Sequence, residues 1–305
     1  MKKNENDLVS LRVIKQNNIP NISIYYLLLL QDDRLAAGYD DEIIRIFSLK
    51  NDFKLEMELR GHTETVIYFF QSENRKLVSC SYDRSIKIWN IEETSYDCEY
   101  TIKDAHDQSI CQVISLHNDR MASSSNDNKI KIWKKSHPYN LIKILKRNIE
   151  IGGYIYIYSP SNKEVLFAMY ENDELCIWNL STYQCETIVE KIFNYYSGSF
   201  LEIPGNKIIF GGYNVIQVID LISFESIYIK NDNQLGGVYS MIYLNNGIVL
   251  CGGTNGSLFA YDIINNRIQK IKNIKETDDI TSLIFYKDDL IISGSLSSNI
   301  KLITY

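Results

Sequence analysis

The side chains most able to do chemistry are four histidines and a run of three serines. His62 and His106 each stand ahead of a predicted strand, whereas His117 and His137 lie in turn-like segments. Residues 123–125 are all serine and could supply a nucleophile, but they belong to a strand and its turn, without the flanking glycines of a nucleophile elbow. No histidine or cysteine has the spacing of a metal-ligand set. The sequence therefore predicts no catalytic residue and no metal site.

Adjacent carboxylates and glycine pairs also have explanations simpler than catalysis. The pairs at 40–41 and 278–279 lie in predicted turns, where solvated acidic loops are far commoner than general acid and base pairs. The glycine pairs at 152–153 and 236–237 are not followed by a helix whose N-terminal amides could bind a phosphate. We therefore expect no enzymatic activity, no cofactor and no small-molecule substrate.

The composition is that of a globular protein whose partners are not polyanions. Of 305 residues, 45% are hydrophobic and 23% are charged, so the chain can bury a large core. The formal net charge of -6 disfavours nucleic acid and anionic membranes, because both reward clustered Lys and Arg. The six cysteines show no close pair, as expected for reduced, buried thiols. No signal-peptide pattern follows the first residues, and the longest apolar run, 22–30, is too short to span a bilayer, so a cytoplasmic or nucleocytoplasmic location is expected.

One four-residue strand pattern returns seven times and accounts for nearly the whole chain. Its copies lie at residues 44–47, 86–89, 130–133, 175–178, 216–219, 258–261 and 300–303, so their ends are 41 to 45 residues apart. Four strands of about six residues with short turns need about forty residues, which matches this period. In the second copy we expect strands at 65–70, 77–81, 85–91 and 96–102. A fixed period of this length is typical of a repeat architecture.

Two of the repeats carry a further signature. The matching residues are His62, Ser81, Asp83 and Trp89 in the second repeat, and His106, Ser125, Asp127 and Trp133 in the third. In both, the Asp precedes the Trp by six residues and the Ser precedes the Asp by two. These segments resemble the WD-repeat β-propeller family, and the resemblance extends over roughly residues 8–305. It implies that each set forms a buried hydrogen-bond network, which clamps the loop before the first strand of a blade to the turn between the second and third strands.

The two ends of the chain are expected to share one blade. Residue 305 ends on the third strand of the seventh repeat, while residues 8–15 alternate apolar and other side chains ahead of the first repeat. The family closes its ring by lending an N-terminal strand to the last blade. The resemblance therefore implies an all-β fold, a single seven-bladed propeller over residues 1–305 with four antiparallel strands per blade, closed by strand 8–15. Residues 1–7 are expected to be flexible.

The loops at one end of the blades, called the top in this family, are expected to bind a protein partner. Acidic and tyrosine side chains outnumber basic ones there, which favours a Lys- or Arg-rich peptide or surface, although acidic turns can also serve solubility alone. The expected contacts are Tyr39, Asp40, Asp41, Tyr82, Arg84, Asn126, Tyr170, Glu171, Asp173, Glu174 and Tyr213.

The sequence thus favours a non-catalytic interaction scaffold or adaptor, either free or as a subunit of a larger assembly. The alternative is a substrate-recognition module of a multi-protein enzyme such as a ubiquitin ligase. Family members that dock on ligase adaptors often carry Trp-Asp-x-Arg, and no tryptophan of this chain is followed by Asp. The Phe-Arg-Arg-Gly motif of the phosphoinositide-binding members is absent as well.

Overall fold

The computed structural model is all-β and built from four-stranded antiparallel sheets. It describes residues 11–18, 22–92, 97–147, 153–161, 163–171, 174–189, 198–231, 235–271, 274, 278–287 and 289–304. Over these residues there are seven such sheets, and the only helical segments are two short 3-10 turns, Asn245–Gly247 and Thr254–Gly256. The predicted fold class is therefore confirmed. The chain forms two compact units, residues 28–192 and residues 1–27 together with 193–305.

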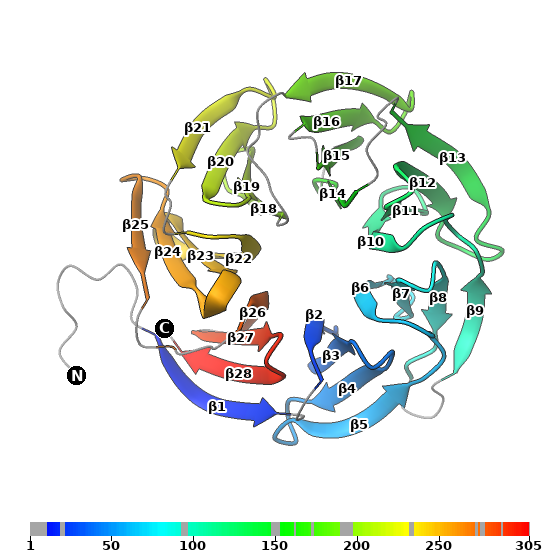
Figure 1. The fold of residues 1–305 in the computed structure, drawn as a ribbon, viewed down its shortest axis with the longest axis horizontal. Helices are drawn as coiled ribbons and strands as arrows, with labels where there is room; N and C mark the ends of the chain where they lie inside the picture. The colour runs from blue at the N-terminus through cyan, green and yellow to red at the C-terminus, as the bar shows by residue number, and fades with distance from the viewer. Residues whose placement is uncertain are drawn as a thin grey trace. The chain divides into compact units, whose positions relative to one another are not determined.

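In the unit of residues 28–192, each sheet takes its strands in chain order. The orders are β6-β7-β8-β9, β10-β11-β12-β13 and β14-β15-β16-β17, and β3 to β5 complete the sheet β2-β3-β4-β5 (Figure 1). The bounds are β2 Ile24–Leu29, β3 Arg34–Tyr39, β4 Ile44–Ser48, β5 Lys54–Leu59, β6 Val66–Gln71, β7 Leu77–Ser81, β8 Ile86–Trp89, β9 Cys98–Ile102, β10 Ile110–Leu116, β11 Arg120–Ser125, β12 Lys129–Lys134, β13 Leu141–Lys146, β14 Ile155–Tyr158, β15 Val165–Tyr170, β16 Glu174–Asn179 and β17 Gln184–Val189.

The alternation of apolar and polar residues in the sequence matches the alternation of buried and exposed side chains in the strands. In β8, Ile86 and Ile88 are buried while Lys87 between them is partly exposed, as expected for side chains on opposite faces of a strand. The four strands predicted for this repeat agree with β6 to β9 to within three residues. The turn that joins β7 to β8 places Arg84 at a φ of 66°, the left-handed conformation that ends such a turn.

Apolar faces of successive sheets pack against each other. One core joins β10–β13 to β14–β17 and contains the side chains Leu116, Ile130, Ile132, Leu145, Ile155, Ile157, Leu166 and Trp178, all at most 5% exposed. Between β3 and β6 the backbones approach so closely that a Cβ on Gly38 would lie 2.9 Å from the carbonyl oxygen of Val66. Only glycine fits at that position.

The unit of residues 1–27 and 193–305 contains three sheets. Their orders are β18-β19-β20-β21, β22-β23-β24-β25 and β1-β28-β27-β26. The bounds are β1 Arg12–Asn18, β18 Ser199–Ile203, β19 Lys207–Gly211, β20 Val215–Asp220, β21 Ser226–Asn231, β22 Val238–Leu244, β23 Ile248–Gly253, β24 Leu258–Asp262, β25 Arg267–Lys270, β26 Ile280–Lys287, β27 Leu290–Ser295 and β28 Asn299–Thr304.

The last sheet is completed by the N-terminal strand. β1 pairs antiparallel with β28, from Arg12 opposite Thr304 to Asn18 opposite Asn299, with a bulge after Val13 (Figure 1). Leu11, 3% exposed, anchors the start of β1 in a core shared with Ile280, Ile291 and Ile303. The fold class predicted this closing strand, although its bounds are Arg12–Asn18 instead of 8–15. The expectation of flexibility for residues 1–7 lies outside the described residues.

Removing β1 should destabilise the protein strongly. A chain that starts at residue 19 leaves the edge of β28 unpaired and the core without Leu11, so we expect a loss of about 3 kcal/mol or more in the free energy of unfolding. Thermal and urea unfolding of the truncated and full chains measure it. A synthetic peptide of residues 11–18 should restore part of the loss, and a scrambled peptide should not. An unchanged melting temperature would contradict the role of β1.

Candidate partner-binding surface

A buried chain of hydrogen bonds joins four elements around His62. His62, in the loop before β6, places its Nδ1 2.8 Å from Asp83 Oδ2 in the β7–β8 turn, and its Nε2 2.8 Å from Ser79 Oγ in β7. Trp89, the last residue of β8, donates its indole Nε1–H to the same Ser79 Oγ at 2.8 Å. His62 and Trp89 are 4% and 1% exposed. The loop is therefore fastened to the sheet by groups that water does not reach.

The donors in this chain can be assigned from one end to the other. The indole nitrogen of Trp89 can only donate, so Ser79 Oγ accepts from it and is free to donate its own proton to His62 Nε2. His62 then carries its proton on Nδ1 and donates it to the Asp83 carboxylate. Ser85 donates its hydroxyl to the other carboxylate oxygen of Asp83 at 2.7 Å. Every side-chain polar atom in this hydrogen-bond network has a partner, and His62 is neutral.

The third blade repeats this arrangement around His106. Its Nδ1 lies 3.0 Å from Asp127 Oδ2 and its Nε2 2.7 Å from Ser123 Oγ, while Trp133 Nε1 donates to Ser123 Oγ at 2.8 Å. His106 is completely buried. We call these two sets, His62-Ser79-Asp83-Trp89 and His106-Ser123-Asp127-Trp133, the two clamps.

The serines of the clamps are not the ones that the sequence analysis assigned. Ser81 instead donates to the carbonyl oxygen of Glu64 at 2.8 Å and accepts from the backbone N–H of Asp83 at 3.0 Å. The assignment of Ser81 is wrong because β7 and β8 pair only as far as Cys80 opposite Ile86, so Ser81 lies past the end of β8. Ser79 lies opposite Lys87, where its Oγ can accept a hydrogen bond from the indole N–H of Trp89.

The same error and the same cause hold in the third blade. Ser125 donates to the carbonyl oxygen of Gln108 at 3.1 Å and accepts from the N–H of Asp127, whereas Ser123 lies opposite Lys131. A signal for the correct serines exists in the sequence, since a serine stands ten residues before the tryptophan in both repeats, at 79 and 123. A serine also stands eight residues before the tryptophan in both repeats, at 81 and 125. Spacing in the sequence alone therefore does not show which serine belongs to the clamp.

Comparison with known proteins now bears on this geometry. The sequence model of the WD40 family (WD domain, G-beta repeat) matches residues 53–90 and 96–134, the two segments that contain the clamps. The fold is similar to that in "Crystal structure of WD40 beta propeller domain of Doa1", with a TM-score of 0.79 and 14% sequence identity over 97% of this chain and 98% of that chain. Residues 53–90 and 96–134 are therefore WD40 repeats, and the chain has the fold of a WD40 β-propeller. No curated protein sequence matches it.

Other blades of this WD-repeat propeller have lost parts of the clamp. In the fourth blade Ala168 replaces the serine, and the buried indole Nε1 of Trp178 has no hydrogen-bond partner among the described residues. In the seventh blade Ser293 is kept but Ile303 replaces the tryptophan, and within the described residues the Ser293 hydroxyl is likewise unpaired. An unpaired buried polar group costs about 1–3 kcal/mol. The two complete clamps are therefore the parts of this network that stabilise their loops.

Burial and charge set the protonation of the clamps. Burial lowers the pKa of His62 and of His106 below the usual value, and the carboxylates of Asp83 and Asp127 oppose this shift without cancelling it. Burial would raise the pKa of Asp127, but the hydrogen bond and charge of His106 and two backbone N–H groups outweigh it and lower that pKa to about 2. At neutral pH each clamp holds a neutral imidazole against an ionised carboxylate.

The clamps hold neighbouring loops that also contact each other. The backbone N–H of Ala105 donates to the carbonyl oxygen of Arg84 at 2.9 Å, and the Arg84 guanidinium lies 3.4 Å from the Asp104 carboxylate. We call the loops 60–65, 82–84, 104–109, 126–128 and 153–154, with the turn 40–42 and residue 171, the clamped loop surface. It lies entirely within the unit of residues 28–192.

Tyrosines form part of this surface. The hydroxyl groups of Tyr82 and Tyr154 contact each other, and the ring of Tyr154 stacks on that of Tyr156 with centroids 6.0 Å apart. The backbone N–H of Tyr154 donates to Glu171 Oε1 at 2.9 Å. Tyr82, Arg84, Asn126 and Glu171 were predicted from the sequence and lie together here. Tyr154 was missed, because no repeat signature marks it.

Two of the predicted tyrosine contacts are wrong. Tyr39 and Tyr170 are 0% and 3% exposed, so neither can reach a partner. Each lies at the position that Ser81 holds in the second blade, and its ring is covered by an arginine: Arg45 lies 4.8 Å from the Tyr39 ring and Arg147 5.8 Å from the Tyr170 ring. Aromatic rings thus fill the interior where the clamp has been lost.

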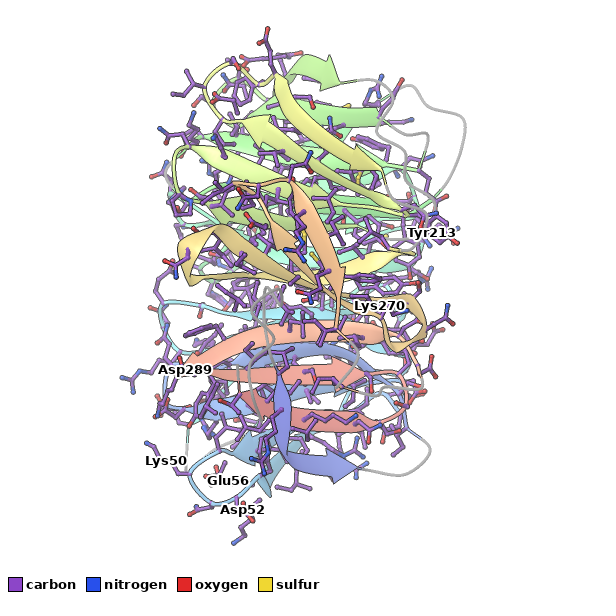
Figure 2. The ribbon with its side chains drawn as sticks, turned by 90° about the vertical axis from the view of Figure 1, so that its left-hand side faces the viewer. Lys50, Asp52, Glu56, Tyr213, Lys270 and Asp289 are labelled. Carbon is purple, nitrogen blue, oxygen red and sulfur yellow. The ribbon has the colours of Figure 1, made fainter. Side chains whose placement is uncertain are left out.

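The acidic charge at this end is smaller than the sequence indicated. Asp41 pairs with Arg45, and Glu174 with Arg147. Asp173 lies outside the described residues. Asp40 is exposed at its turn. Tyr213 belongs to the other unit, is 47% exposed, and its side chain extends away from the ribbon (Figure 2).

Within the part of the chain that the structure describes, no three His, Cys, Asp or Glu side chains group so as to hold a metal ion. Over the same residues, no helix has the length and apolar character to cross a membrane. The six cysteines all lie among the described residues and none forms a disulfide; Cys98 and Cys185 are half-buried and the rest are buried.

The choice between Ser79 and Ser81 can be tested by a double-mutant cycle. Ser79→Ala and Trp89→Phe remove the two ends of one hydrogen bond, so we expect a coupling free energy of about 1 kcal/mol from urea unfolding of the single and double variants. The matched cycle with Ser81→Ala and Trp89→Phe should give a value near zero. Equal coupling in the two cycles would contradict the clamp geometry.

The buried neutral histidines predict acid sensitivity. Their pKa values are lowered on folding, so between those values and about 6.5 the unfolded chain binds more protons, and stability falls as the pH falls. Two such groups give a slope of at most about 2.8 kcal/mol per pH unit. Urea unfolding between pH 5 and 8 measures it. A flat profile below pH 6.5 is the contrary result.

Proposed function

We propose that this WD-repeat propeller is a non-catalytic scaffold or adaptor, a subunit of a larger assembly, which binds a protein partner through the clamped loop surface. WD-repeat propellers commonly serve protein interaction, and the observation that carries the proposal here is the placement of the clamps. The two blades that keep complete clamps are adjacent, and they fix the loops on either side of Arg84. A surface whose loops are held in advance loses less conformational entropy when it binds.

The chemistry of the surface favours a basic partner. Glu42 and Glu64 are exposed there, and neither has an ion pair among the described residues. Asp107 is neutralised by Lys129, and Asp104 by Arg84, so those two carboxylates contribute less. Tyr82 and Tyr154 add aromatic area beside the acidic groups, as is common where one partner supplies Lys or Arg side chains.

Affinity purification of the tagged full chain, followed by mass spectrometry, tests the proposal. We expect a stoichiometric protein partner that is lost, or at least tenfold depleted, from the double variant Glu42→Lys with Glu64→Lys. The control is Glu56→Lys, an exposed acidic residue on β5 near Lys50 and Asp52 (Figure 2). A partner that the double variant retains would contradict binding at this surface. Recovery of ligase subunits in place of a stable partner would favour the recognition-module alternative.

A further inference from the structure

The outer strand β13 presents an unusual concentration of exposed apolar side chains. It is the last strand of the sheet β10-β11-β12-β13, so one of its edges has no neighbouring strand within that sheet (Figure 1). Among the described residues, eight large hydrophobic side chains are exposed, and three of them belong to β13: Leu141 at 43%, Ile142 at 44% and Ile144 at 43%. The other five are scattered over separate strands and turns. An exposed apolar edge strand is prone to aggregate unless a partner or another part of the protein covers it.

The exposed side chains have a fixed arrangement. Leu141 lies opposite Trp133 and Ile144 opposite Lys131, and directly paired residues project from the same face, so Leu141 and Ile144 share one face of the sheet. Leu145 projects from the other face into the core and is 1% exposed. The strand is therefore held firmly by its inner face, while its apolar outer face and its free edge stay accessible.

The charged side chains of β13 and of the residues that flank it in the sequence are all basic. Residues 134–147 contain five basic side chains and no acidic one. Lys135 and Arg147 pair with Glu73 and Glu174. Lys134, Lys143 and Lys146 are exposed, and no carboxylate of the described residues pairs with them. In a chain of net charge -6, such a segment attracts acidic groups.

The equivalent strand of the first blade, β5, has a different charge pattern. Leu55 of β5 lies opposite Phe47, as Leu141 lies opposite Trp133, and is 41% exposed. Its neighbours, however, include Glu56 and Glu58, so β5 mixes both signs of charge. Mixed charge is a common protection of an outer strand, and β13 lacks it.

We propose that β13 binds an acidic, extended segment of a partner protein, which adds to the free edge as a further antiparallel or parallel strand. The main chain of such a segment would pair with the outward N–H and C=O groups of the edge. Its apolar side chains would cover Leu141 and Ile144, and its Asp or Glu side chains would meet Lys146 on that same face and Lys143 on the opposite face. This surface is separate from the clamped loop surface, and the proposal does not depend on the proposed function.

Other occupants fit these observations less well. A second copy of β13 would place lysines against lysines, which is destabilising across paired strands. Nucleic acid would neutralise the lysines but would leave the isoleucines and the leucine in contact with water. Only a segment that carries both acidic and apolar side chains matches the whole surface.

Selection from a random peptide library displayed against the full chain tests this inference. We expect enriched peptides that combine Asp or Glu with apolar residues, and whose affinity falls at least tenfold with the variant Leu141→Glu. The matched control Leu55→Glu should keep the affinity, and both variants should retain the thermal unfolding of the wild type. Selected peptides that are basic, or that bind Leu141→Glu as well as the wild type, would overturn the proposal, as would a selection that yields no peptide.

The mode of binding has its own test on a selected peptide. N-methylation of the alternate amides that face β13 should abolish binding, while methylation of the other alternate set should leave it, because only one set pairs with the edge. Equal effects of the two sets would exclude strand addition. Analytical ultracentrifugation of the free chain should show a monomer; a dimer that Leu141→Glu dissociates would show a second copy to be the occupant and contradict the acidic partner.

Discussion

The chain of hydrogen bonds from Trp89 through Ser79 and His62 to Asp83 is the interaction on which the candidate binding surface depends. It has one end deep in a sheet and the other in a solvent-facing turn. Strand pairing fixes the sheets without it, but nothing in strand pairing fixes the loop before β6. Every donor in this hydrogen-bond network has an acceptor. The network therefore stabilises one loop conformation without leaving a buried polar group unpaired.

Blades that lack this network fill the corresponding interior positions with other side chains. The first and fourth blades replace the serine with Ala37 and Ala168, and a buried tyrosine covered by arginine fills the neighbouring position. The tyrosine hydroxyls of Tyr39 and Tyr170 are buried without a hydrogen-bond partner among the described residues. Such blades keep the apolar core and hold their turns by ion pairs such as Arg45 with Asp41, in which the arginine side chain is 8% exposed. The second and third blades are thus the ones whose loops are held by complete clamps.

Sequence reasoning predicted the sheets much better than the site. Ile86, Lys87 and Ile88 alternate in burial as their types require, and the period alone places four strands in each repeat. Ser79 could not be chosen over Ser81, because the choice depends on where β7 stops pairing with β8. Tyr39 and Tyr170 were assigned to the surface because the sequence places them beside turns; in the structure they end β3 and β15, and their buried rings lie next to arginines. The exposed face of β13 was missed since alternation predicts which face is buried, and says nothing about what covers the other.

The two surfaces differ in both form and charge. The clamped loop surface is made of turns with Glu42 and Glu64 exposed, and β13 is a strand edge with Lys143 and Lys146 exposed. A scaffold with one acidic and one basic surface can hold two different proteins at once without competition between them.

Hydrogen–deuterium exchange of the full chain, free and in complex with the partner recovered by affinity purification, tests the central claim most directly. We predict slowed exchange in peptides that cover residues 60–65, 82–84 and 104–109, with little change in the β4–β5 turn. Protection confined to the β4–β5 turn and the other turns at that end of the sheets, with the clamped loops unchanged, would contradict it.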